Sequence, residues 1–177
     1  MSEDTNPPVS TGRGDDGTTT LLGSGRMGKH DPRIIVLGDV DEASSFLGLA
    51  RAEAGDGDIG TLLLEIQRLL YRVMGDVAMP KEDNAVGEDD LRYVDEALSE
   101  WRGRVEIPRE FVVPGESRLG ALLDVARSVV RRAERSLVAA GYAEGYPNAV
   151  RAVNRLSDLL FVVARGADGK VRTSKGS

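Results

Sequence analysis

Apolar residues recur every three or four positions along most of the chain, as expected for helices that bury one face. They do not alternate with polar residues in the way that a half-buried strand requires. The pattern predicts five helices, at about 32–55, 58–79, 89–103, 117–140 and 148–165. Short connections, several of them rich in Gly or Pro, separate these segments. The sequence therefore predicts an all-α fold, a five-helix antiparallel bundle without a sheet.

The two ends of the chain lack this periodicity. Residues 1–10 are polar and contain a Pro-Pro pair, and we predict that they are disordered. Residues 166–177 are polar and contain glycine, and we predict a flexible tail. Residues 11–165 are then one helical domain, long enough to bury a core without disulfides.

Composition restricts the function of this domain. The 177 residues include no Cys, which excludes disulfides, thiolate nucleophiles and thiolate metal sites. A formal net charge of −6 disfavours a general nucleic-acid binder, which needs a broad basic face. No apolar run reaches the ~18 residues of a membrane-spanning helix, and the first residues lack the features of a signal peptide. We expect a cytoplasmic protein with no nucleic-acid or membrane partner.

The helix predicted at 117–140 carries two stripes, at about 100° per residue. The apolar stripe predicts the contact with the core and comprises Leu119, Leu122, Ala126, Val129, Ala133 and Leu137. Arg127, Arg131 and Glu134 share a different stripe, at i, i+4 and i+7. A solvated face with weak intrahelical ion pairs is the simpler interpretation of this charged stripe.

The helix predicted at 148–165 favours another interpretation. One face carries side chains at i, i+4, i+7 and i+11, namely Asn154, Asp158, Phe161 and Arg165. The other sides of this helix are mostly apolar, so most of the helix is expected to be buried. Buried polar groups need partners, because leaving them unpaired is costly. Those partners come from a neighbouring helix or subunit, or from a ligand.

A glycine- and threonine-rich segment, TGRGDDGTTTLLGSGRMGK at 11–29, directly precedes the first helix. Gly12, Gly14 and Gly17 permit positive φ and a close approach of backbone to ligand, and successive amides in such a loop can bind an anion. The segment also supplies three basic side chains, Arg13, Arg26 and Lys29. It lacks the spacing of a Walker A loop. The alternative interpretation is a flexible arm that merely precedes the fold.

Four motifs occur in order along the chain. The first is T-G-R-G-D-D-G-T-T-T with R-M-G-K, and the second is G-D-V-D-E. The third is F-V-V-P-G followed by R-S-V-V-R-R-A-E-R, and the last is N-R-L-S-D-L-L-F. Over residues 11–165 this combination resembles the PduO-type ATP:cob(I)alamin adenosyltransferase family.

The resemblance implies a five-helix bundle that assembles as a homotrimer, with active sites between subunits. It implies that the 5′-deoxyadenosyl group of ATP is transferred to cob(I)alamin, which gives adenosylcobalamin and triphosphate. Mg²⁺ accompanies ATP, with ligands that the sequence does not assign. Because the nucleophile is the metal of the corrinoid, no general base is needed. The product can pass directly to an adenosylcobalamin-dependent mutase.

The resemblance also implies two groups of site residues. The nucleotide group comprises Thr11, Gly12, Arg13, Gly14, Thr19, Thr20, Lys29, Arg131, Arg132, Ala133, Glu134, Arg135 and Asn154. The catalytic group comprises Asp41, Phe111, Arg127 and Arg131. In this group Asp41 and Arg127 match a salt bridge near the corrinoid. Phe111 matches the aromatic residue that displaces the lower axial ligand of cobalt.

Three positions depart from the family pattern. Gly12 stands where a basic residue is usual, Ser44 where Asn is usual, and Glu116 where Gly is usual. Two alternatives to the enzyme follow from the residues. A non-catalytic sensor would bind ATP or corrinoid without turnover. A purely structural bundle would pair Arg127 and Arg131 across an interface and would bind no ATP.

Overall fold

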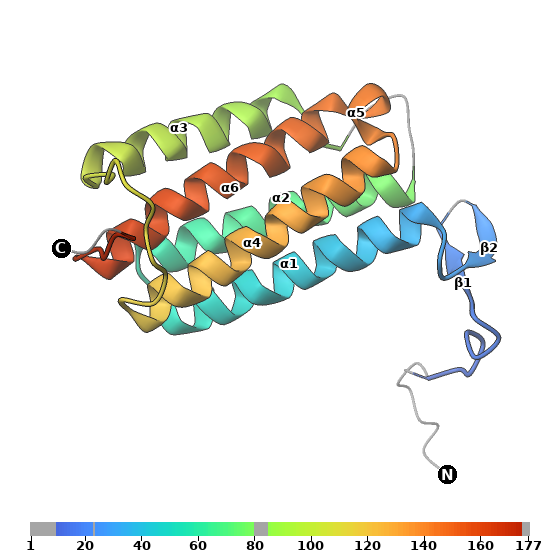
Figure 1. Cartoon of the computed structure of the whole chain (residues 1–177). Coiled ribbons are helices and arrows are strands. Elements are labelled where there is room, and N and C mark those ends of the chain that lie inside the picture. The colour runs from blue at the N-terminus through green and yellow to red at the C-terminus, as the bar shows by residue number, and fades with distance from the viewer. Residues whose placement is uncertain (1–9, 23, 80–84, 175–177) are drawn as a thin grey trace, which may run out of the picture.

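The computed structural model describes residues 10–22, 24–79 and 85–174, and these form an elongated helical bundle (Figure 1). The long helices are α1 Pro32–Ala54, α2 Asp58–Ala78, α3 Glu88–Arg104, α4 Arg118–Ala139 and α6 Pro147–Asp168. The predicted five-helix bundle is confirmed, with boundaries within a few residues of those expected. One further short helix, α5 Tyr142–Gly145, occupies the connection between α4 and α6.

N-cap side chains fix the starts of helices α1 and α4. The Asp31 carboxylate accepts a hydrogen bond from the Arg33 backbone amide at 3.0 Å, and Pro32 occupies the first turn of α1. The Ser117 hydroxyl accepts from the Gly120 amide at 2.8 Å at the start of α4. Helix α6 also begins with a proline, Pro147, but its N-cap residue Tyr146 makes no side-chain cap bond. The Asp31 and Ser117 side chains satisfy amides that have no partner within their helices.

Helix α4 lies at the centre of the arrangement, packed against α1 on one side and α6 on the other (Figure 1). Helix α2 packs on α1, and α3 packs on α6. The core is almost entirely aliphatic, and α4 contributes Leu123, Ala126, Val129, Val130, Ala133 and Leu137 to it. Leu119 and Leu122, also expected in the core, are partly buried against its edge. No helix in the described ranges combines the length and apolarity needed to cross a bilayer.

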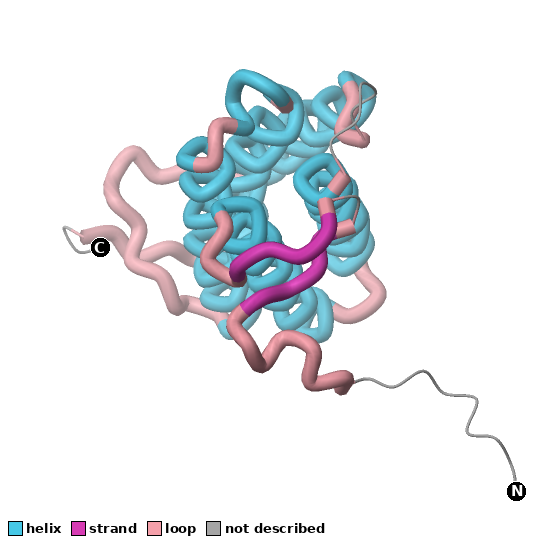
Figure 2. The backbone as a smooth tube through the Cα atoms, turned by 90° about the vertical axis from the view of Figure 1, so that its right-hand side faces the viewer, coloured by secondary structure: helices cyan, strands magenta, loops and turns pink. Residues whose placement is uncertain are grey.

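The glycine- and threonine-rich segment folds into a small antiparallel hairpin, which the expectation of no sheet missed. Strand β1 Thr18–Leu21 pairs with β2 Gly25–Gly28. Three consecutive β-branched threonines favour an extended backbone, and Gly25 supplies a positive φ of 74° where β2 begins. The hairpin lies at one end of the bundle, beside the start of α1 (Figure 2). The residues that precede the first helix are therefore attached to the bundle by a defined element.

At the C-terminal end, the last helix extends beyond the predicted boundary at residue 165. Helix α6 continues past Gly166 to Asp168, because Ala167 packs against the core and the Asp168 carboxylate binds Ser117. The chain then returns along the segment 111–113. The Ser174 amide donates to the Phe111 carbonyl at 2.8 Å, and the Val113 amide donates to the Arg172 carbonyl at 2.9 Å. Residues 1–9 of the predicted disordered N-terminus and residues 175–177 lie outside the described ranges.

Candidate active site

Hydrogen bonds within the opening segment hold its loop against the hairpin. Arg26 donates to the Arg13 carbonyl at 2.8 Å and to the Asp16 carboxylate at 2.9 Å. Asp16 also accepts from the hydroxyl and the amide of Thr18, and these bonds are the main cause that lowers the pKa of Asp16. Among the described residues, the hydrogen bonds of the Arg26 side chain are thus all made to other residues of this segment.

Other cationic and hydroxyl groups of this segment face solvent. Thr11, Gly12, Arg13, Thr20 and Lys29 are exposed, and Gly14 and Thr19 are half-buried. A Cβ atom at Gly14 would lie 3.2 Å from Lys29 Nζ, so the ammonium group lies against the loop backbone. The loop and the end of β2 therefore place an ammonium group beside glycine backbone, which suits an anionic ligand.

The arginine run on α4 divides between two directions. Arg131 and Arg135 are exposed and, with Glu134 and Val138, line a shallow pocket of about 330 Å³. Arg132 points toward α1, where it pairs with Glu42 and lies 3.4 Å from Asp39. The hydrogen bond to Glu42 is the main cause that raises the pKa of Arg132. Arg132 therefore joins α1 to α4, while Arg131 and Arg135 remain exposed on the surface.

Two further residues of the predicted nucleotide group lie elsewhere. The methyl group of Ala133 is fully buried in the core, so it acts as a packing group within the chain. Asn154 is exposed on α6, as is Asp158. In the described part of the chain, Asn154 makes no side-chain hydrogen bond. The predicted stripe on α6 is thus solvent-facing at its N-terminal half and buried at Arg165.

Phe111 and Arg127 lie at one pocket of about 260 Å³, roofed by the segment between α3 and α4. The pocket is lined by aromatic and cationic side chains, among them Arg109, Phe111, Pro114, Arg127, Phe161 and Arg165. Phe111 lies at the rim of this pocket and is 85% exposed. The structure thereby brings together two residues of the predicted catalytic group, from a loop and from a helix. An exposed aromatic ring beside a cation suits a large, flat, partly anionic ligand.

The salt bridge expected between Asp41 and Arg127 is not formed within the described part of the chain. Asp41 is exposed on α1. Arg127 Nε instead lies 3.3 Å from Asp124 Oδ1. The pairing of Asp41 with Arg127 stays a prediction for two copies of the chain, in keeping with the sites between subunits that the resemblance implies.

Sequence reasoning missed Asp124, which is buried beside this pocket. Its other carboxylate oxygen accepts from Arg165, which also lies 2.9 Å from Asp168. Arg165 thus finds its partners on α4 and α6 of the same chain, one of the options that its stripe left open. The available signal was an acidic residue three positions before Arg127, on the face that carries the arginines.

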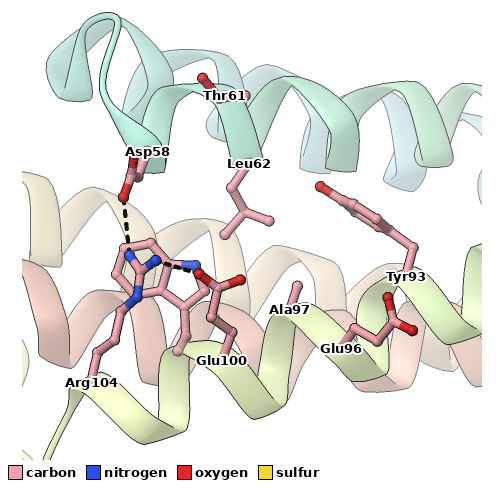
Figure 3. A pocket seen from close by; sticks show the side chains of 9 residues that line it. Asp58, Thr61, Leu62, Tyr93, Glu96, Ala97, Glu100 and Arg104 are labelled. Atoms are coloured by element: carbon pink, nitrogen blue, oxygen red, sulfur yellow. Dashed lines mark hydrogen bonds and ion pairs between the residues drawn. The ribbon is translucent and has the colours of Figure 1, made fainter.

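A third pocket, of about 370 Å³, lies between α2 and α3 and contains none of the predicted site residues (Figure 3). Its cation, Arg104, binds Asp58 at 3.1 Å and Glu100, and lies 4.9 Å above the ring of Trp101. Tyr93 borders the same groove, where partial burial raises the pKa of its hydroxyl. Nowhere in the described ranges do three His, Asp or Glu side chains gather as a metal site would require.

Comparison with known proteins decides the family. The sequence profile described as cobalamin adenosyltransferase matches residues 9–167, nearly the whole chain. This chain belongs to the cobalamin adenosyltransferase family. It is 40% identical over 159 residues to a cobalamin adenosyltransferase of Cupriavidus metallidurans, covering 89% of this chain and 86% of that protein. It is 37% identical over 177 residues to a corrinoid adenosyltransferase of Mycobacterium tuberculosis H37Rv, covering 92% and 91% of the two proteins.

Solved adenosyltransferase structures share the fold. A phenylalanine-to-alanine variant of the PduO-type ATP:corrinoid adenosyltransferase of Lactobacillus reuteri, complexed with cobalamin and ATP, superposes with a TM-score of 0.85. Its sequence is 27% identical, and the match covers 96% of this chain and 100% of that one. An arginine-to-lysine variant complexed with ATP gives a TM-score of 0.82 at 29% identity, covering 91% and 94% of the two chains. The resemblance inferred from the four motifs is confirmed.

Proposed function

We propose that the pocket beside Phe111 receives the corrinoid and that the exposed arginines of α4, together with loop 11–29, receive ATP. The chain is an ATP:corrinoid adenosyltransferase, which transfers the 5′-deoxyadenosyl group of ATP to cob(I)alamin and releases triphosphate. One observation carries the assignment of the site. Arg127 at the Phe111 pocket and Arg131 at the neighbouring pocket are separated by one turn of α4, about 6 Å along the axis.

This adjacency suits a direct transfer between two substrates. The corrinoid supplies the cobalt nucleophile, so the protein has to align the 5′ carbon of ATP with it and to stabilise the departing triphosphate. Arg131 and Arg135 present guanidinium groups, and Lys29 presents an ammonium group beside glycine backbone. Cations fixed in place stabilise charge that develops on a leaving group without reorganising. Phe111, exposed at the rim, would contact the lower face of the corrinoid and exclude an axial ligand.

The proposed site includes a second copy of the chain. Asp41 on α1 and Arg127 on α4 do not pair within one copy, and both reach the surface. In a homotrimer, α1 of one subunit would face α4 of the next and close each site. Asp41 would then bind the outer nitrogens of Arg127, because Nε is already directed at Asp124.

Mg²⁺ enters the proposal with ATP. This ion usually keeps several waters and binds through substrate phosphates with few protein ligands, so we expect it to arrive on the triphosphate. We also propose that the protein works in the cytoplasm, where its co-substrate ATP is supplied. Direct delivery of adenosylcobalamin to a dependent mutase is a further part of the proposal.

The test is an anaerobic assay with chemically reduced cob(I)alamin, ATP and Mg²⁺. We expect adenosylcobalamin and triphosphate to appear in equal amounts. Arg131→Ala should lower kcat by roughly 10²–10³-fold, as removal of one preorganised donor does elsewhere. Arg68→Ala is the matched control, because Arg68 is an exposed arginine of α2 that pairs only with Glu65 among the described residues.

Two results would contradict the assignment. Near-normal turnover by Arg131→Ala would remove Arg131 from the nucleotide site. ATP binding by the wild-type protein without any loss of the cobalt(I) absorption band would favour the sensor alternative.

A further inference from the structure

The Phe111 pocket has a buried carboxylate at its base. Asp124 lies on α4 three residues before Arg127, and its side chain is only 4% exposed. One oxygen faces Arg127 Nε at 3.3 Å, and the other accepts from Arg165. A carboxylate removed from water needs such partners to remain ionised at low cost. Both oxygens of Asp124 are therefore engaged, one on the side of the pocket and one on the side of the core.

The partner on the core side is itself fixed. The Arg165 side chain is 1% exposed, and its guanidinium binds Asp168 at 2.9 Å. Asp168 in turn accepts from the amide and the hydroxyl of Ser117, at 3.1 and 2.9 Å. Ser117 is also the cap of α4. A series of hydrogen bonds and ion pairs therefore joins the start of α4 and the end of α6 to Asp124.

The Asp168 carboxylate packs directly against the backbone of Gly120 on α4. A Cβ atom at Gly120 would lie 1.9 Å from Asp168 Oδ1 and 2.9 Å from the Ser117 hydroxyl, so only glycine admits the carboxylate there. The Arg165 guanidinium also lies 5.2 Å from the ring centroid of Phe161, a residue that lines the pocket. The buried group therefore borders the pocket through two of its members, Asp124 and Arg165.

Charge balance makes Arg127 the fourth member of the group. Asp124 and Asp168 supply two negative charges and Arg165 supplies one positive charge. Arg127 supplies the missing positive charge, yet its side chain is 27% exposed and borders the pocket. Holding the guanidinium by Nε fixes its plane and leaves the two outer nitrogens directed away from Asp124.

We infer that Asp124 is a positioning residue for the corrinoid side of the reaction. It orients the Arg127 guanidinium, and Arg165 and Asp168 keep Asp124 itself in place. This inference rests on the proposed assignment of the Phe111 pocket to the corrinoid. A fixed guanidinium binds its partner without first losing rotamer freedom, so the benefit should appear in corrinoid binding and not in ATP binding.

The experiment measures KM for cob(I)alamin and KM for ATP separately in the Asp124→Asn variant, which keeps the shape and removes the charge. We expect the KM for cob(I)alamin to rise on the order of 10–100-fold, as for other groups that orient a site residue, with the KM for ATP unchanged. Asp76→Asn is the matched control. Asp76 is also a buried aspartate, but it accepts from the amides of Ala85 and Val86 away from the pocket.

A double-mutant cycle tests whether Asp124 acts through Arg127. Adding Asp124→Asn to Arg127→Ala should cause little further rise in the KM for cob(I)alamin, because the group to be oriented is gone. Fully additive effects would overturn the inference. So would an Asp124→Asn variant whose corrinoid KM equals that of the wild type, or one that loses both substrates equally and melts earlier, as a scaffold residue would.

A third substitution tests the inference if the Asp124→Asn variant does not fold. Arg165→Lys keeps the buried positive charge but removes the fork that holds Asp124. We expect the same selective rise in corrinoid KM, and an unchanged corrinoid KM would overturn the inference. Failure of the proposed function is a separate result, because in that case the wild-type protein itself forms no adenosylcobalamin.

Discussion

The Asp31 side chain caps the start of helix α1 and also makes the stability of the folded chain depend on pH. Its carboxylate accepts from the Arg33 amide and from the Arg33 guanidinium, each within 3.0 Å. The bond from the Arg33 side chain is the main cause that lowers the pKa of Asp31 from 3.8 to about 2. Protonation is therefore harder in the folded chain than in the unfolded chain. The stabilisation by the ionised group is fully present above pH 3.8 and is lost as the pH falls toward 2.

We predict that Asp31→Asn lowers the free energy of unfolding near neutral pH but not near pH 2. Asparagine still caps the helix, so the substitution isolates the contribution of the charge. Denaturant unfolding of both proteins at several pH values measures the difference. Asp56→Asn, at an exposed position between α1 and α2, should cause no comparable difference. A gap between wild type and Asp31→Asn that persists at pH 2 would contradict the prediction.

Neighbouring residues on α4 show which features of a side chain helical periodicity predicts and which it does not. Arg131 and Arg132 are adjacent, but a rotation of about 100° separates their directions. One faces solvent and the other pairs with Glu42 across the α1–α4 contact. Periodicity predicts that the two residues diverge. It does not reveal which helix Arg132 meets, because the order of helices around α4 depends on packing across the whole chain.

At the scale of elements, the long helices were predictable because their apolar residues recur at helical spacing, and because Asp31 and Ser117 cap two of them. The hairpin β1–β2 could not be predicted from the sequence. Each of its strands has only four residues and pairs only with the other strand. The bond between the segments 111–113 and 172–174 was also beyond prediction. It joins positions about 60 residues apart through backbone atoms, and backbone atoms leave no side-chain pattern in the sequence.

This C-terminal segment holds the loop that presents Phe111. The Ser174 amide binds the Phe111 carbonyl, and the Thr173 hydroxyl donates to Glu110 at 2.6 Å. We predict that ending the chain after Gly169 raises the KM for cob(I)alamin while α6 and its bond to Ser117 remain. Helical content measured by circular dichroism should be nearly unchanged.

Two substitutions give effects with which the truncation can be compared. Thr173→Val removes only the bond to Glu110 and keeps the backbone bonds, so its effect should be smaller than that of the truncation. Phe111→Ala sets the size of effect expected when the aromatic ring itself is lost. If the truncated chain binds and converts corrinoid like the full chain, the segment does not position Phe111.

At the scale of the whole molecule, the helices that carry the proposed site also expose apolar side chains. On α1 these include Ile35 and Leu49, and on α4 they include Val125 and Val138. The same two helices carry Asp41, Arg127 and Arg131. Exposed apolar groups on the same helices as these charged side chains are typical of a surface that a second subunit covers. The proposed trimer would bury this surface and complete the site in one step.

We predict that Leu49→Glu dissociates the assembly and abolishes adenosyl transfer together. Leu49 is 54% exposed on α1, and a carboxylate there would be buried without a partner in an interface. Tyr71→Glu is the matched control, because Tyr71 is 73% exposed on α2, away from α4. Light scattering after size exclusion should give about 57 kDa for the wild type and the control, three times the chain mass of 19.0 kDa, and a lower mass for Leu49→Glu. A monomeric wild type with full activity would show that one chain completes the site alone. An intact, active Leu49→Glu trimer would instead move the interface to another face.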